Sequence, residues 1–250
     1  MVEHGDDAGL ATFFSDDALE PGRVATLGEG EAHHARVRRV SLGERVRLTD
    51  GAGAIGAGKL VRLSKHQALV ELDDVRHVDP LPEIHLLVPI ADRERMLWLA
   101  EKATELGITS WRPVMWRRSR SVSPRGEGVA FLQKVRARMI AALTQSGGAW
   151  LPTLYPEASV ERAAAAAPAA TRYLLDASGD LLQASTVESP VTIAVGPEGG
   201  VEDFERATLL SAGFTPLRLA PLTLRFETAA IVACGAIRAA LDATVENRNG

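Results

Sequence analysis

The sequence predicts an α/β domain that follows a small β-barrel. Over residues 1–78, short runs with β-branched residues are separated by glycine-rich turns, whereas over residues 83–250 strand-like runs alternate with helical patterns. The segment HVDPLPE at 77–83 lies between the two parts and, with its two prolines, is typical of a linker.

The first part contains four predicted strands and one helix. The strands are the runs at 23–27, 45–50, 59–63 and 67–75. The helix covers 31–40, and the glycine-rich segment 50–58 is predicted to be a turn. Short strands with such turns favour a small barrel over an open sheet.

The second part alternates strands and helices, which favours a mostly parallel sheet covered on both faces. Apolar residues at helical spacing on one face, followed by Gly107, mark the first of its helices. The low-complexity segment 161–170 is assigned to a helix end and a loop. The predicted strands are 83–90, 108–115, 172–177, 191–196 and 215–220, and the predicted helices are 92–107, 129–145, 202–213 and 227–243.

Composition excludes several classes of protein. No apolar run reaches the roughly 18 residues of a membrane span, and the acidic N-terminus does not resemble a signal peptide. A single cysteine, Cys234, excludes a disulfide framework and a cysteine-based zinc site, so we expect a reduced, cytoplasmic protein. The histidines show no metal-binding HExxH spacing, and the Gly-x-Ser-x-Gly motif of many hydrolases is absent.

Charge is unevenly distributed along the chain. The net charge is −4, but residues 1–31 alone carry −7, so the remainder carries +3. The segment 107–126 contains five arginines and no acidic residue. A local basic face that binds phosphates is therefore compatible with an acidic protein.

The loop Gly196-Pro197-Glu198-Gly199-Gly200 is the first candidate binding site. It follows a predicted buried strand and precedes a helix, and ligands of α/β sheets bind at such carboxyl ends. Its glycines let backbone N–H groups approach a ligand closely. The loop lacks the pattern of a Walker or dinucleotide motif, so the sequence does not predict ATP or NAD as its ligand. A tight turn without a ligand is the alternative.

A second loop of this kind lies within 217–230. Arg225 stands at an apolar strand–helix junction, where a guanidinium needs an acceptor, either Glu227 or a ligand. Glu227 or Thr228 is also suited to cap the following helix.

Tryptophans interleave with arginines in WRPVMWRRSRSVSPR at 111–125. Trp111 and Trp116 suit stacking on RNA bases while the arginines bind phosphates. The alternative is that both tryptophans belong to the core and the arginines are only solvated.

Taken together, these motifs resemble the bacterial 16S rRNA (uracil-N3) methyltransferases of the RsmE type, which belong to the SPOUT superfamily. The resemblance covers nearly the whole chain and is most specific where the Gly-Pro-Glu-Gly-Gly loop is followed by Leu-Arg-x-Glu-Thr-Ala. Near the N-terminus, His33-x-x-x-Val37-x-Arg39 and Asp50-Gly51-x-Gly53 resemble the PUA-like RNA-binding barrel of that family.

The resemblance implies a PUA-like RNA-binding β-barrel at 1–78 and a SPOUT methyltransferase domain at 83–250 with a deep trefoil knot. It also implies a homodimer that binds S-adenosyl-L-methionine (SAM) in the knot. The expected cofactor-binding residues are Leu175, Val195, Gly196, Pro197, Glu198, Gly199, Gly200, Leu219, Ala220, Pro221, Leu222 and Leu224.

The implied substrate is a uridine in the decoding region of 16S rRNA, methylated at N3 in the assembled small ribosomal subunit, with no metal or membrane involved. Arg225 would stabilise charge on the uracil oxygens, and Glu198 is a candidate proton acceptor. The expected RNA-binding residues are His33, Arg36, Arg39, Arg117, Arg118 and Arg120.

The chain departs from the family pattern where Gly147, Gly148 and Ala149 stand in place of a common arginine, and at Leu222 and Phe226. Two other functions therefore stay open. One is a SPOUT enzyme that acts on another RNA such as tRNA, and the other is a non-catalytic RNA-binding factor for ribosome assembly.

Overall fold

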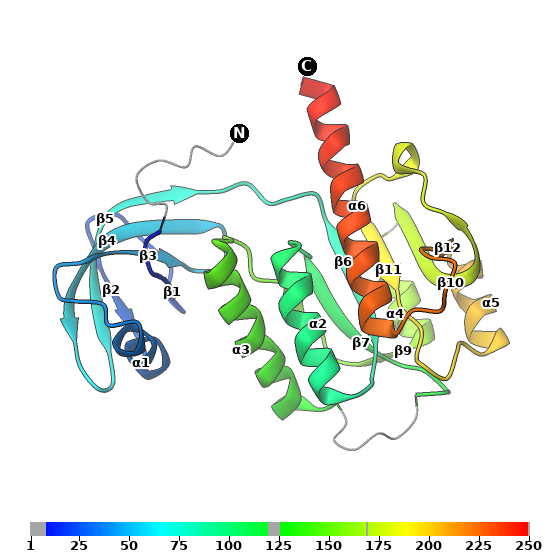
Figure 1. Cartoon of the computed structure of the whole chain (residues 1–250), viewed down its shortest axis with the longest axis horizontal. Helices are drawn as coiled ribbons and strands as arrows, with labels where there is room; N and C mark the ends of the chain where they lie inside the picture. Colours follow the sequence, from blue (N-terminus) through cyan, green and yellow to red (C-terminus); the bar gives the residue numbers. More distant parts are fainter. Residues whose placement is uncertain (1–8, 120–125, 169, 250) are drawn as a thin grey trace. The chain divides into compact units, whose positions relative to one another are not determined.

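The computed structural model describes residues 9–119, 126–168 and 170–249, with side chains up to residue 243 (Figure 1). The chain forms two compact units. The first contains Met1–Pro80 together with Ile140–Leu151, and the second contains Leu81–Met139 and Pro152–Gly250. The first unit thus includes a segment that lies far from it in the sequence.

The first unit is built on a five-stranded sheet in the order β1-β3-β4-β5-β2. β1 runs parallel to β3, and the other neighbours are antiparallel. Among the described residues β1 and β2 form the two ends of this order and do not pair with each other. The strands are β1 (Thr12–Phe14), β2 (Val24–Leu27), β3 (Arg45–Thr49), β4 (Ala54–Leu63) and β5 (Ala68–His77).

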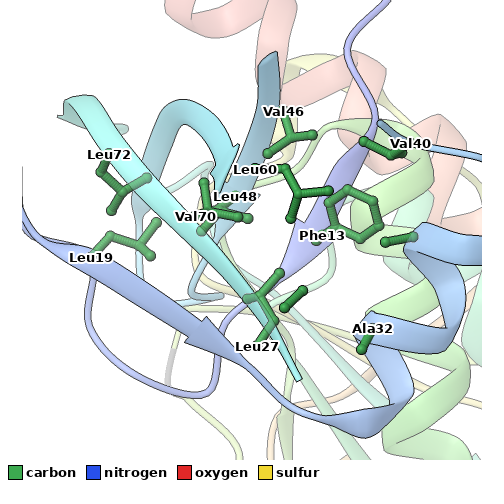
Figure 2. Packing of buried hydrophobic residues seen from close by; sticks show 12 residues of the cluster. Phe13, Leu19, Leu27, Ala32, Val40, Val46, Leu48, Leu60, Val70 and Leu72 are labelled. Atoms are coloured by element: carbon green, nitrogen blue, oxygen red, sulfur yellow. The ribbon is translucent and has the colours of Figure 1, made fainter. Parts of the chain in front are cut away.

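One apolar core holds these strands and helix α1 (Glu29–Val37) together. Ala32 and Ala35, three residues apart, are the buried positions of α1, because such spacing keeps two side chains on one helix face. Figure 2 shows Phe13, Val46 and Leu60 pointing toward one another from three different strands.

The prediction of a turn over 50–58 is correct only for its first residues. Gly51 and Gly53 have positive φ, and the Asp50 carboxylate accepts hydrogen bonds from the backbone N–H groups of the turn. From Ala54 onward the chain is strand β4. Gly58 lies at a register irregularity where a Cβ would collide with the backbone of Glu71, so here glycine permits close strand pairing rather than a turn.

The segment Ile140–Leu151 joins the first unit through backbone hydrogen bonds. Gly53 N–H donates to the Ala149 carbonyl and Leu151 N–H donates to the Gly51 carbonyl, each at 2.9 Å. The indole N–H of Trp150 donates to the Val78 carbonyl at 2.8 Å, and its ring meets His77 edge to face. The departure from the family pattern at 147–149 therefore lies beside the turn at 50–53.

The second unit contains a seven-stranded sheet in the order β12-β10-β11-β6-β7-β8, with β9 also paired to β7. Every strand pair recorded in the described part of this sheet is parallel, which confirms the predicted parallel sheet. The strands are β6 (Ile84–Pro89), β7 (Ser110–Met115), β8 (Thr153–Leu154), β9 (Ala158–Ser159), β10 (Thr171–Leu181), β11 (Val191–Ala194) and β12 (Thr215–Arg218).

In this unit, helices pack together in two separate pairs. α2 contacts α6, which also contacts β6, and α4 contacts α5 (Figure 1). The segment 161–170, assigned from the sequence to a helix end and a loop, contains most of the short helix α4, capped by Ser159. The helices are α2 (Arg93–Glu105), α3 (Val129–Ser146), α4 (Val160–Ala166), η1 (Ala184–Thr186), α5 (Asp203–Ser211) and α6 (Phe226–Asn249).

Within the described residues, no helix combines the length and the apolar character that crossing a membrane requires.

Candidate functional site

A cleft of about 550 Å³ lies in the second unit, where β11 and β12 end and beside residues 175–177 of β10. This is the position that parallel sheets use for ligands, and the volume suits a small molecule. Most of its wall is apolar. The residues that line it are Leu175, Asp176, Ala177, Val195, Gly196, Pro197, Glu198, Gly200, Val201, Arg206, Leu217, Arg218, Leu219, Ala220, Leu222, Thr223, Leu224, Arg225, Phe226 and Ala229.

The cleft brings together nearly all the residues expected to bind a cofactor. Gly199 and Pro221 are the two that do not line it. Leu222 does line it and is 77% exposed. The two loops, predicted from separate motifs of the sequence, thus form one wall.

The loop after β11 is fixed by its backbone. Gly200 N–H donates to the Pro197 carbonyl at 2.9 Å, and Gly200 has φ 83°, a conformation that favours glycine. A Cβ at Gly196 would lie 2.6 Å from the Val201 side chain. A Cβ at Gly199 would lie 2.9 Å from the Arg118 carbonyl oxygen, so this glycine serves contact with the arginine segment rather than the cleft.

The arginine segment is held against this loop by helix α5. The buried carboxylate of Glu205 accepts from Arg117 N–H at 2.7 Å and from Glu202 N–H at 3.0 Å, the latter as part of a capping box. The Arg118 guanidinium pairs with Glu202 and donates to the Gly199 carbonyl at 3.4 Å. Arg117 and Arg118 therefore lie beside the cleft loop.

The Arg225 side chain is exposed and lines the cleft. Within the described part of the chain its guanidinium makes no hydrogen bond or ion pair. The alternative that Arg225 only pairs with Glu227 is therefore wrong, because Glu227 is turned toward Arg95 of α2 at 3.9 Å.

Arg95 connects three elements. It pairs with Glu198 of the β11–α5 loop and approaches Glu227 at the start of α6. Glu227 is buried, and among the described residues its Oε2 has no hydrogen-bond partner. Sequence reasoning missed Arg95, because it lies in an ordinary amphipathic helix about 100 residues before Glu198.

Asp176 and Arg206 form a second charged pair in the cleft wall, with 2.9 Å between Arg206 Nε and Asp176 Oδ2. Burial would raise the pKa of Asp176, but hydrogen bonds from the Ser178 backbone, Arg206 and the Ser178 hydroxyl outweigh it and lower the pKa below its ordinary value. Asp176 therefore stays charged at neutral pH.

Arg218, the last residue of β12, also lines the cleft. Its Nε is buried, and in the described part of the chain it has no hydrogen-bond partner. Arg218 was not among the residues predicted from the sequence; the signal that could have identified it is a charged residue at the end of an apolar strand.

The residues expected to bind RNA lie in both units. His33, Arg36 and Arg39 are exposed on or just after α1, and Arg117 and Arg118 are exposed in the second unit. Arg120 falls outside the described residues. The prediction that Trp111 and Trp116 stack on RNA bases is wrong. Both rings are buried, 0% and 4% exposed, and both belong to the apolar core.

Among the residues that the structure describes, no group of three or more histidine, cysteine, aspartate or glutamate residues is placed so that it could hold a metal ion.

Comparisons with known proteins agree with this geometry. A sequence model of the RNA methyltransferase domain matches residues 78–238, and one of the RNA methyltransferase PUA domain matches 27–73. The chain is 29% identical to Ribosomal RNA small subunit methyltransferase E of Mycobacterium bovis over 238 residues, 90% of each chain. It is 28% identical to the Synechocystis protein of that name over 229 residues, 88% of this chain and 74% of the relative.

Among solved structures, Ribosomal RNA small subunit methyltransferase E from Neisseria gonorrhoeae bound to S-adenosyl methionine aligns with a TM-score of 0.82. The two are 26% identical, and the alignment covers 92% of this chain and 97% of that one. The methyltransferase-domain match spans well over half of the chain and follows the match to the PUA domain in the sequence. This protein therefore belongs to the RNA methyltransferase family.

Proposed function

We propose that this enzyme transfers a methyl group from SAM to N3 of a uridine in the decoding region of 16S rRNA, in the assembled small ribosomal subunit. The observation that carries the proposal is the cleft where β11 and β12 end, lined by Arg225, whose guanidinium has no hydrogen-bond or ion-pair partner among the described residues. Relatives named as small-subunit rRNA methyltransferases support rRNA as the substrate.

The residues present fit SAM. The cleft is of the right size, its wall is mostly apolar with few polar groups, and Arg218 contributes a buried donor that has no acceptor among the residues the structure describes. The structure of the N. gonorrhoeae protein with SAM supports the same cofactor here. The two cleft loops, 195–200 and 219–224, would hold it. When bound, SAM supplies a methyl group that its sulfonium has already activated.

The chain's own residues then have two tasks. Loss of the N3 proton leaves negative charge on the flanking carbonyl oxygens of uracil, which Arg225 would stabilise by hydrogen bonding. Glu198 would accept the proton. Because Arg95 occupies Oε1 of Glu198, Oε2 is the oxygen available for it. Holding uracil and cofactor in the cleft aligns them for transfer.

We further propose that the C-terminal segment is threaded through a trefoil knot of the SPOUT type. β12 lies at the end of the sheet order, yet the helix α6 that follows it returns to contact α2 and β6. The loop at 219–225 begins that return and lines the same cleft as the loop at 195–200, which supports the assignment of both loops to the knot.

The proposed assembly is a homodimer in which the PUA-like part, 1–78, docks on RNA and 83–250 performs the transfer. Trp98 on α2 and Val232 on α6 are large apolar side chains that are 45% and 42% exposed, and the two helices contact each other. Exposed apolar side chains on neighbouring helices support a dimer interface on this face. We also propose a cytoplasmic location, because that is where a ribosomal substrate would be met.

The test is mass spectrometry of 16S rRNA nucleosides from cells with and without this protein. The proposal requires 3-methyluridine to disappear from 16S rRNA in its absence and to return when purified small subunits receive the enzyme and SAM. If the modified nucleoside is lost from tRNA instead, the enzyme acts on another RNA. If no nucleoside changes although the protein binds small subunits, it is a non-catalytic assembly factor.

A further inference from the structure

The charged side chains of the cleft wall do not balance one another. Three arginines and two acidic residues line the cleft: Arg206, Arg218, Arg225, Asp176 and Glu198. Asp176 is neutralised by Arg206, and Glu198 by Arg95. Among the described residues, Arg218 and Arg225 are left without an acidic partner. The cleft therefore has an excess of positive charge and suits a ligand with oxyanion groups.

The two unpaired arginines differ in depth. Arg225 is exposed, whereas Arg218 is half-buried and its Nε is closed off from solvent. A buried N–H group without an acceptor is unfavourable, and because this one lies in the wall of a cleft, a bound ligand can supply the acceptor. A donor at this depth meets a group that enters the cleft, while the exposed Arg225 meets groups presented from outside.

We propose that Arg218 binds the α-carboxylate at the methionine end of SAM, an inference that rests on the proposed function. The planar guanidinium offers two parallel N–H groups that match a carboxylate. Asp176 lines the same cleft as Arg218 and follows Leu175, the register partner of Leu217; beyond this point the register shifts, and Arg218 lies opposite Leu181. A methionine end carries both an ammonium and a carboxylate, so a cleft lined by charges of both signs suits it.

The experiment compares SAM with decarboxylated SAM, which lacks only the carboxylate, by isothermal titration calorimetry on the full chain. Arg218→Met should weaken SAM binding about 10- to 100-fold, the range expected for a lost charge-assisted hydrogen bond. It should leave the affinity for decarboxylated SAM unchanged within about twofold, because that ligand has no group for Arg218. Arg218→Lys should restore part of the SAM affinity.

Arg162→Met is the matched control, since Arg162 is exposed on α4 and its side chain does not line the cleft. Wild-type protein needs no substitution and gives a second measurement: it should bind decarboxylated SAM more weakly than SAM by a similar factor. Equal affinity of the wild type for both ligands would overturn the inference.

Other outcomes are equally decisive. If Arg218→Met lowers the affinity for SAM and for decarboxylated SAM equally, Arg218 only supports the fold and the inference is overturned. Unchanged SAM affinity with weaker binding of small subunits would assign Arg218 to an RNA phosphate and overturn the inference. If the carboxylate-specific loss is seen but 16S rRNA carries no dependent methylation, the inference stands and the proposed function fails.

Discussion

Arg225 is the residue on which the proposed chemistry depends most. Its guanidinium lines the cleft and makes no contact with an acceptor among the described residues. Arg225→Lys replaces a planar fork of donors by a flexible point charge. We expect single-turnover methylation of small subunits to fall by roughly 10²-fold or more, as on removal of one preorganised donor. SAM affinity, measured by calorimetry, should change little.

Thermal stability separates this role from a structural one. Because Glu227 faces Arg95 and not Arg225, Arg225→Lys should leave the melting temperature unchanged. Glu227→Gln should lower it, since Glu227 is buried beside Arg95. A lower melting temperature for Arg225→Lys with an unchanged rate would contradict the proposed role.

The lowered pKa of Asp176 leads us to expect that the free energy of unfolding depends on pH. Its pKa in the folded protein lies below the ordinary value of 3.8, mainly because hydrogen bonds from Ser178 and Arg206 outweigh burial. Such a carboxylate stabilises the fold above pH 3.8, and this contribution is lost as the pH falls through the lowered pKa. The pair is partly exposed, so we expect at most about 1 kcal/mol.

Urea unfolding of wild type and Asp176→Asn at pH 7 and pH 3 measures this contribution. The variant should be less stable at pH 7, and the difference should shrink at pH 3. Asp180→Asn, which alters an exposed carboxylate on the same strand, is the control and should have little effect at pH 7. A difference for Asp176→Asn that does not vary with pH would exclude the lowered pKa as its source.

The sequence identified residues of the site that stand in recognisable loops. Gly196, Glu198 and Arg225 were found because glycine-rich and charged loops follow predicted strands. Arg95 and Arg218 were not found, because neither stands in a local sequence pattern. Arg95 is identified only by its ion pairs with residues distant in the sequence, and Arg218 only by its buried Nε. Gly199 was assigned to the cofactor, yet its missing Cβ makes room for Arg118.

At the scale of elements, the guanidinium of Arg95 on α2 contacts both the β11–α5 loop and the start of α6. Arg95→Met would leave Glu198 and the buried Glu227 without their cation. We expect a loss of about 1–2 kcal/mol in the free energy of unfolding, because an uncompensated buried charge is unfavourable. We also expect weaker SAM binding, because Glu198 belongs to a loop that lines the cleft. Urea unfolding and calorimetry measure the two effects.

Arg138→Met is a suitable control, since Arg138 of α3 is exposed and pairs with Glu101 of α2, the helix that carries Arg95. It should cost less than about 1 kcal/mol and leave SAM binding unchanged. If both variants behave alike, Arg95 contributes no more than an ordinary surface ion pair.

Elements with a regular apolar period were predicted well, and irregular ones were not. The helix expected at 92–107 is α2, Arg93–Glu105, with Asp92 as its cap. Strand β1 was missed because it has three residues and gains its stability from pairing with β3. The glycines of β4 read as turn signals, whereas tertiary contact with β5 makes them part of a strand.

At the scale of the whole molecule, the first compact unit is not a continuous stretch of sequence. Residues 140–151 complete it by hydrogen bonding to the turn at 51–53. No local sequence pattern predicts a contact between segments about 100 residues apart in the chain. A division at the linker alone, into 1–78 and 83–250, therefore omits this segment from the first unit.

The proposed division of labour between the units gives a further prediction. Arg36 and Arg39 are exposed at α1 in the first unit, and the residues of the cleft all belong to the second. Replacing both by glutamate removes two cations and adds two anions where RNA is expected to dock. We expect the affinity for small subunits to fall about 10- to 100-fold at roughly 0.1 M salt, with a shallower dependence on salt.

SAM affinity of this double variant should equal that of wild type. The matched control is Arg62→Glu with Arg76→Glu, which makes the same change in net charge on the exposed parts of β4 and β5 rather than at α1. Filter binding of small subunits at several salt concentrations, with calorimetry of SAM, measures all three proteins. Equal losses of subunit affinity in both double variants would show that overall charge, not a docking face at α1, governs binding. A loss confined to Arg36→Glu with Arg39→Glu would place RNA contact at α1, because only position distinguishes the two variants.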